Sequence, residues 1–183
     1  MLVLAVQEGP ILIATLLIGA VGTVAAPNLA NPLEPAEHGL MQCWRPHPIR
    51  KTCAVIASYR KTGPGAYDNE AIVGLSKQGP VTVETQTAVT LRGDAVCGKV
   101  RLQDIQTGIL RQGDKVVAAR DAQPILDKVV QVMAPLAGQE TCTRYERSGS
   151  DFTAKISLEG KYHQDRDTMV KWVSPSDGYT VTP

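Results

Sequence analysis

Residues 41–53, MQCWRPHPIRKTC, bring together side chains that could ligate a metal, form a disulfide or bind an anion. Cys43, His47 and Cys53 are ligands of the kind that zinc prefers. Their spacing, C-x3-H-x5-C, lacks the close cysteine or histidine pairs of common zinc modules, and no fourth ligand is evident. We therefore expect the two cysteines to form a disulfide and no metal to bind here.

The cysteines number four, and all of them follow the apolar N-terminal region. An even count in an exported chain predicts two disulfides rather than free thiols. Sequence alone permits three connectivities. We favour Cys43 with Cys53 and Cys97 with Cys142, because a proline-rich turn would bring the first pair together. The absence of C-x-x-C excludes thioredoxin-like chemistry.

A second feature of this region is its charge, because residues 45–61 contain five basic side chains and no acidic one. Arginine and lysine interleaved with aromatic rings bind anions and anchor protein interfaces. We expect the partner to be an anionic envelope component or another protein, and not a nucleic acid. The alternative is a solvated hairpin, because a strand turns successive side chains to opposite faces. The predicted binding residues are Trp44, Arg45, His47, Arg50, Lys51, Tyr59 and Arg60.

Catalytic patterns are weak. The histidines are His38, His47 and His163, and Asp165 and Asp167 lie beside His163. No G-x-S-x-G elbow is present, and SGSD at 148–151 is typical of a turn. No G-x-G-x-x-G motif precedes a helix, so we predict no nucleotide cofactor. We assign no catalytic residues, and a small secreted hydrolase that uses His163 or His47 stays the alternative.

The N-terminal region predicts export. Residues 11–22, ILIATLLIGAVG, form an apolar run that is followed by small residues, so we expect residues 1–26 to be a signal peptide. The alternative is an uncleaved anchor, since residues 9–33 could nearly span a bilayer, and only then would the chain contact a membrane. Residues 27–40, with three prolines, predict an extended leader. The rest would be periplasmic or extracellular.

Residues 41–183 predict a single α+β domain. Asp121 as N-cap, Pro124 in the first turn and an apolar face at helical spacing predict one principal helix over about 121–137. We expect this helix to pack on an antiparallel sheet that two disulfides stabilise. Segments rich in β-formers predict strands within 52–60, 70–76, 81–93, 95–103, 140–146, 152–160, 169–174 and 179–183.

Composition fits this domain and gives few clues to function. Hydrophobic residues make up 43% of the chain, charged residues 20% and aromatic residues 4%, which is typical of a globular protein and not of a disordered one. We expect an exported, disulfide-stabilised, non-catalytic protein of the cell envelope or periplasm that binds another component. The alternatives are the small secreted hydrolase and a purely structural envelope protein.

Overall fold

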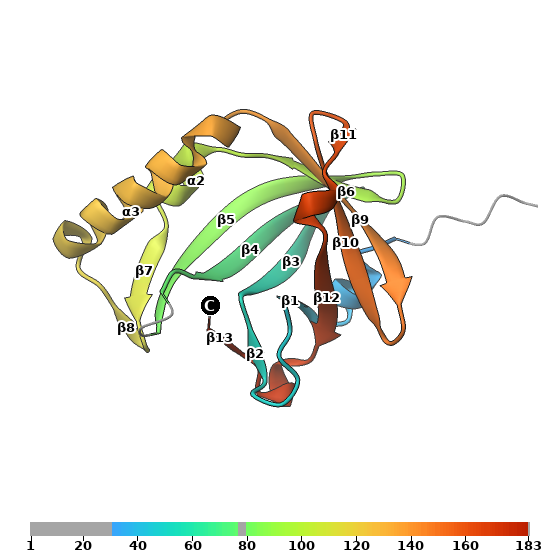
Figure 1. The fold of residues 1–183 in the computed structure, drawn as a ribbon, viewed down its shortest axis with the longest axis horizontal. Coiled ribbons are helices and arrows are strands. Elements are labelled where there is room, and N and C mark those ends of the chain that lie inside the picture. The colour runs from blue at the N-terminus through green and yellow to red at the C-terminus, as the bar shows by residue number, and fades with distance from the viewer. Residues whose placement is uncertain (1–30, 77–79, 183) are drawn as a thin grey trace, which may run out of the picture.

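The main feature of the fold is a closed antiparallel barrel. The computed structural model describes residues 31–76 and 80–182. Within them, eight strands pair in chain order, and the last barrel strand pairs with the first (Figure 1). These strands are β1 (Met41–Trp44), β3 (Val55–Gly63), β4 (Ala66–Gly74), β5 (Val81–Arg92), β6 (Ala95–Lys99), β9 (Glu140–Ser148), β10 (Asp151–Leu158) and β12 (Thr168–Val173).

The predicted α+β arrangement, an antiparallel sheet with one principal helix packed on it, is therefore wrong. β1 lies in the stretch that we interpreted as a loop, and it joins β3 to β12 and so closes the sheet. Closure gives every barrel strand a partner on both sides, and the opposite wall covers the inner face. A helix is not needed to bury that face, so the sheet dominates the structure.

Strand register defines which residues face the interior. Side chains alternate between the two faces of a strand, and directly paired residues share a face. Gln42 pairs with Ala57, Ala57 with Ala71, and Ala71 with Thr85, which gives one inward-facing row across four strands. Ile56, on the neighbouring position, therefore faces outward.

One end of the barrel is closed by Leu33, which precedes β1. Its side chain is fully buried, and it packs in one cluster with Tyr67 and Val96 at the ends of β4 and β6. The short helix α1 (Glu34–Glu37) follows directly. Residues 31–40 belong to the predicted leader, whereas the predicted signal peptide, residues 1–26, lies outside the described residues.

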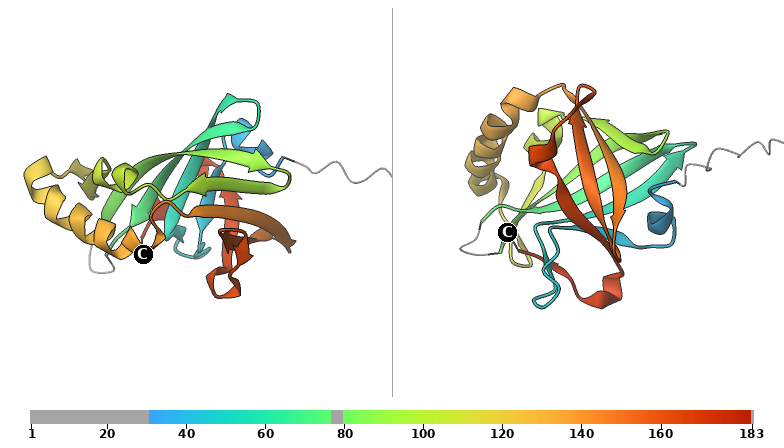
Figure 2. Two further views of the ribbon diagram at one scale, coloured as in Figure 1. Left: turned by 90° about the horizontal axis from the view of Figure 1, so that it is seen from above. Right: turned by 45° about the vertical axis from the view of Figure 1, so that its right-hand side comes forward.

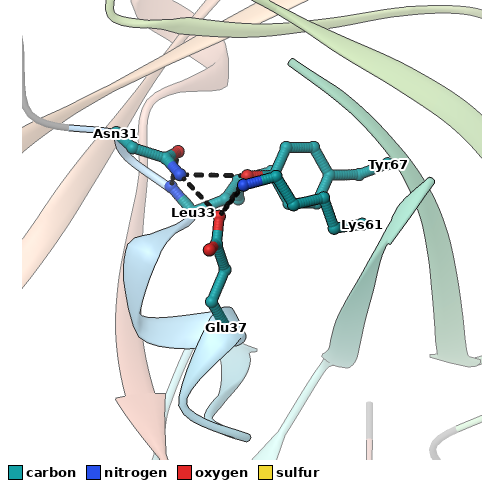
Figure 3. A network of polar contacts seen from close by, with 5 residues as sticks. All are labelled: Asn31, Leu33, Glu37, Lys61 and Tyr67. Atoms are coloured by element: carbon teal, nitrogen blue, oxygen red, sulfur yellow. Dashed lines mark hydrogen bonds and ion pairs between the residues drawn. The ribbon is translucent and has the colours of Figure 1, made fainter. Parts of the chain in front are cut away.

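A polar network holds this segment against the barrel (Figure 3). Glu37 Oε1 accepts hydrogen bonds from the Tyr67 hydroxyl at 2.6 Å, from Lys61 Nζ at 3.1 Å and from Asn31 Nδ2 at 3.0 Å. These bonds lower the pKa of Glu37, with the Tyr67 bond as the largest cause, because they favour the charged carboxylate. The network ties α1 to β3 and β4.

The expected helix is present but lies at the side of the barrel (Figures 1 and 2). It comprises α3 (Ala119–Met133) and the 3-10 turn η1 (Ala134–Leu136), and it begins two residues earlier than predicted. Asp121 lies in its first turn, and Ala118 occupies the N-cap position without a side-chain bond. We assigned Asp121 to the cap because of its residue type, but the alanines before it extend the helix.

The inner side of this helix covers an extension of the sheet. β5 pairs with β6 near its end, and near its start it pairs with β7 (Ile109–Gln112), which is followed by β8 (Lys115–Val116). Leu126 of α3 packs there with Val83 and Leu110 in a buried cluster. The helix α2 (Leu102–Gln106) connects β6 to this extension.

Both predicted disulfides are confirmed. Cys43 is bonded to Cys53, with 5.3 Å between their Cα atoms, and Cys97 is bonded to Cys142, with 4.1 Å between theirs. The first lies in a cluster on the outer face that a parallel pair of strands covers, β2 (Thr52–Cys53) and β13 (Thr180–Val181). The second joins the paired strands β6 and β9.

The remaining short elements lie after β10. They are β11 (Lys161–Tyr162), η2 (Gln164–Arg166) and η3 (Pro175–Asp177). Across residues 31–76 and 80–182, no helix has both the length and the apolar character needed to cross a bilayer.

Candidate functional site

The structure divides the predicted binding residues among three places. The inward row of β1 and β3 includes Trp44 and Tyr59, so these rings face the barrel interior. Arg60 faces outward from β3 and forms an ion pair with Asp68 of β4. The other four, Arg45, His47, Arg50 and Lys51, lie on the loop of residues 45–51 between β1 and β2. We call this segment the stapled loop, because the Cys43–Cys53 disulfide closes its base.

Backbone hydrogen bonds fix the stapled loop at its base. His47 N donates to Thr52 O at 2.8 Å, and Thr52 N donates to His47 O at 3.3 Å, which forms an isolated antiparallel bridge. Arg45 N donates to Met169 O at 2.9 Å and so connects the loop to β12. Together with the disulfide, these bonds leave the loop little freedom.

Two residues of the loop hold an uncommon backbone conformation. Arg45 has a φ of 53° and Lys51 a φ of 49°, in the left-handed region that side chains with a Cβ seldom adopt. Such conformations persist where surrounding contacts determine them, and they cluster at binding sites. Lys51 is held by a hydrogen bond from its Nζ to Asp177 O at 3.0 Å. The loop is thus built in a defined shape.

The tip of the stapled loop exposes an apolar side chain. Ile49 is 92% exposed and lies next to Arg50 and Lys51, which are exposed as well. We did not predict Ile49 as a site residue. The signal that could have found it is its position between Pro48 and a basic pair, because proline disfavours sheet pairing and leaves the isoleucine without a strand to bury it.

Inside the barrel, Gln42 organises three aromatic side chains. Its Oε1 accepts hydrogen bonds from Trp44 Nε1 at 3.2 Å, from the Tyr59 hydroxyl at 2.9 Å and from the Tyr145 hydroxyl at 3.2 Å. Burial raises the pKa of Tyr145 to about 12, and burial likewise raises the pKa of Tyr59. Both phenols therefore stay protonated and neutral at physiological pH.

Next to this cluster lies a cavity of about 280 Å³. Its lining combines the three aromatic rings with threonine hydroxyls, and Gly98 adds no side chain of its own. Ile105 of α2 and Met133 of α3 complete the lining at the end away from Leu33. The threonines that line the cavity are Thr85, Thr87, Thr141 and Thr143.

Comparison with known proteins does not assign this chain to a family. No family model, no curated protein and no solved structure matches the chain. The features of the molecule that bear on function are the stapled loop, the cavity and the remaining polar clusters.

A larger groove of about 690 Å³ lies over the outward face of β3, β4 and β5. Ion pairs neutralise most of its carboxylates. Asp68 pairs with Arg60, Glu84 pairs with Arg111 at 2.5 Å, and Asp104 pairs with Arg101 at 3.0 Å. The groove consequently presents little unpaired charge.

The histidines of the alternative hydrolase make no catalytic pairing in the described part of the chain. His163 Nδ1 lies 3.8 Å from Asp165 Oδ1, and His47 Nδ1 accepts a hydrogen bond from Arg50 N at 3.3 Å. Asp167 accepts from Lys155 Nζ at 2.7 Å and from the Tyr162 hydroxyl at 2.6 Å, and these bonds lower its pKa. The members of a triad, a nucleophile bonded to an oriented base, do not come together in residues 31–76 and 80–182.

Metal binding has no support from the described residues either. Cys43 and Cys53 form a disulfide, so neither is available as a thiolate that could bind a metal together with His47. Within residues 31–76 and 80–182, no group of three or more potential ligands is arranged to hold an ion.

Proposed function

We propose that this protein is an exported, non-catalytic binding protein that attaches to a partner protein through the stapled loop. The observation that carries the proposal is the display of Ile49, which is 92% exposed, at the tip of a loop whose base is closed by a disulfide. Export is supported by the signal-like sequence of residues 1–26 and is compatible with the two disulfides.

A fixed loop reduces the entropy that is lost on binding. Ordering a flexible loop in a complex opposes association, whereas a loop already held in its bound shape avoids that loss. The disulfide, the His47–Thr52 bridge and the left-handed residues Arg45 and Lys51 provide this order in the free protein. Burial of Ile49 would then contribute roughly 1.5–3 kcal/mol to the complex.

The side chains around Ile49 indicate the chemistry of the partner. Arg45, Arg50 and Lys51 are exposed, and the loop of residues 45–51 contains no acidic residue. An acidic surface with a small apolar pocket complements this pattern, because opposite charges speed encounter and the pocket buries the isoleucine. A defined loop shape favours a protein partner over an anionic membrane, whose surface offers no fixed pocket.

Site-specific photo-crosslinking in the cells that make the protein tests this proposal. We expect a crosslinker at position 49 to capture a partner that the same crosslinker at position 132 does not. Val132 is a matched control because it is an exposed apolar residue, 76% exposed, on α3. Equal capture from both positions, or none from position 49, would contradict the proposal.

Affinity for the captured partner gives the second half of the test. We expect Ile49→Ala and Arg50→Ala each to weaken binding, the first by about tenfold or more. Val132→Ala and Arg120→Ala, which change exposed residues of the same types on α3, should leave the affinity unchanged. Binding of the purified protein to anionic lipid vesicles with equal dependence on Ile49 would instead indicate a membrane ligand and overturn the protein partner.

A further inference from the structure

The cavity inside the barrel is separate from the stapled loop and has its own chemistry. Eight-stranded barrels are just wide enough either to fill with side chains or to hold one small ligand. Here, about 280 Å³ stays unfilled, slightly below the range of about 300–1,000 Å³ that is usual for small-molecule sites. We infer that the barrel interior is a binding site for a small uncharged aromatic compound that carries a hydroxyl or carbonyl group.

Aromatic rings provide the apolar part of the site. Trp44 and Tyr145 meet edge to face, with 6.4 Å between their ring centroids and 74° between their planes. Their polar atoms, and the hydroxyl of Tyr59, are all directed to Gln42 Oε1. Because these donors are already engaged, the rings offer the cavity carbon surface, which suits the face or edge of another ring.

Threonine hydroxyls provide the polar part. Thr87 Oγ1 donates to Asp104 Oδ2 at 2.9 Å, but no side-chain hydrogen bond within the described residues engages the hydroxyls of Thr85, Thr141 and Thr143. A hydroxyl both donates and accepts, so it can pair with either an alcohol or a carbonyl of the ligand. The three threonines, on β5 and β9, line the same space from two sides of the wall.

The charges around the cavity argue for an uncharged ligand. Its charged lining residues are Lys99, Arg101 and Asp104. Arg101 Nε and Asp104 Oδ2 lie 3.0 Å apart and compensate each other, and Lys99 is exposed at the end of β6. A charged ligand among the rings and threonines would lose hydration without gaining a counter-charge, which disfavours it.

Three probes of nearly equal size separate the chemical classes. They are benzyl alcohol, benzoate and benzylammonium, each titrated into the isotope-labelled full chain while its amide NMR signals are recorded. We expect benzyl alcohol alone to give saturable shifts at Thr85, Thr141 and Thr143. Equal responses to all three probes would contradict a selective site, and saturable binding of benzoate alone would show that Lys99 and Arg101 create an anion site instead.

A blocking variant tests the location. Thr141→Leu adds carbon atoms to the cavity lining, and we expect it to weaken benzyl alcohol binding by about tenfold or more. Thr90→Leu is the matched control, since Thr90 is exposed and pairs with Cys97 on the outward face of the same barrel. Benzyl alcohol that binds both variants equally well would place the site elsewhere and overturn the inference.

A more conservative variant tests the site even if Thr141→Leu unfolds the barrel. Thr143→Val preserves the shape and removes one hydroxyl, so we expect binding about two- to tenfold weaker. An unchanged affinity would show that Thr143 does not contact the probe and would contradict the inferred site. Ile49→Ala should leave benzyl alcohol binding unchanged. The proposal for the stapled loop and the inference for the cavity can therefore be tested independently.

Discussion

At one end of the barrel Leu33 enters from the segment before β1 and is fully buried, whereas at the other end Ile105 and Met133 line a cavity that stays open. The two ends are formed by the same eight strands, so the difference comes from the connecting segments. α1 and its polar network hold Leu33 in place, while α3 packs on a sheet extension beside the barrel and α2 contacts α3 and β5 (Figure 2).

The closed end contributes to the stability of the fold, whereas the open end leaves the cavity accessible. At the closed end, an apolar side chain fills the space between Tyr67 and Val96, and Glu37 secures it through Tyr67 and Lys61. At the open end, α3 buries Leu126 on Val83 and Leu110 and leaves Met133 at the cavity. The closed end therefore stabilises the fold, and the open end is where we expect the inferred small ligand to enter.

The largest expected effect is the loss of Leu33. Leu33→Ala removes a fully buried side chain from the closed end, and we expect the free energy of unfolding to fall by about 2–5 kcal/mol. Urea unfolding followed by circular dichroism measures this change. Val132→Ala, at a position that is 76% exposed, is the control and should stay within about 0.5 kcal/mol of the wild type. A similarly small effect of Leu33→Ala would show that the segment does not close the barrel.

Much of the secondary structure and both disulfides could be predicted from the sequence. Alternating β-formers indicated the strands, and an apolar face at helical spacing indicated α3. Sequential cysteine pairing was predictable because a short proline-rich stretch joins Cys43 to Cys53. These signals are local, so they can be read without knowledge of the overall fold.

Closure of the barrel depends on a pairing that local patterns do not carry. Gln42 lies opposite Trp172 across the closing strands, but the two are far apart in the sequence. β1 has four residues, too few for a clear alternation, and the cysteine and basic residues around it favoured a loop. The burial of Leu33 could not be predicted from local patterns either, because a proline-rich segment predicts an extended chain and not insertion into a core.

The candidate site was predictable only in part, for the same reason. The basic residues of the stapled loop are close in sequence, and the disulfide keeps them together. Trp44 and Tyr59 belonged to the same predicted cluster, yet strand alternation turns them into the barrel, where Tyr145 joins them from β9. A cavity that several strands share has no sequence motif of its own.

A smaller effect is expected at the open end. Met133→Ala shortens a partly buried side chain of the cavity lining, so we expect a loss of about 1 kcal/mol in the free energy of unfolding. We also expect acrylamide to quench the fluorescence of Trp44 more strongly, because the entrance widens. A Trp172→Phe background isolates the Trp44 signal, since the chain has two tryptophans. Quenching that rises instead with Leu33→Ala and not with Met133→Ala would reverse the assignment of closed and open ends.

The smallest expected effect is the pH dependence of the closed end. Hydrogen bonds from Tyr67 and Lys61 lower the pKa of Glu37, so its carboxylate stabilises the folded state above its ordinary pKa of 4.5. That contribution is lost as the pH falls through the lowered pKa, because the unfolded chain binds the proton first. We expect Glu37→Gln to be less stable than the wild type at neutral pH and to approach it as the solution is acidified.

Glu34→Gln removes the same charge from the same helix without breaking the bonds to Tyr67 and Lys61, which makes it the control for this titration. Urea unfolding at a series of pH values between neutrality and about 2.5 compares the three proteins, with the transition of each followed by circular dichroism. The wild type and Glu34→Gln should lose stability in parallel across the acid range, while Glu37→Gln changes less. Parallel curves for all three would mean that the Glu37 network does not hold the closed end, and Leu33 burial alone would then have to keep the segment in place.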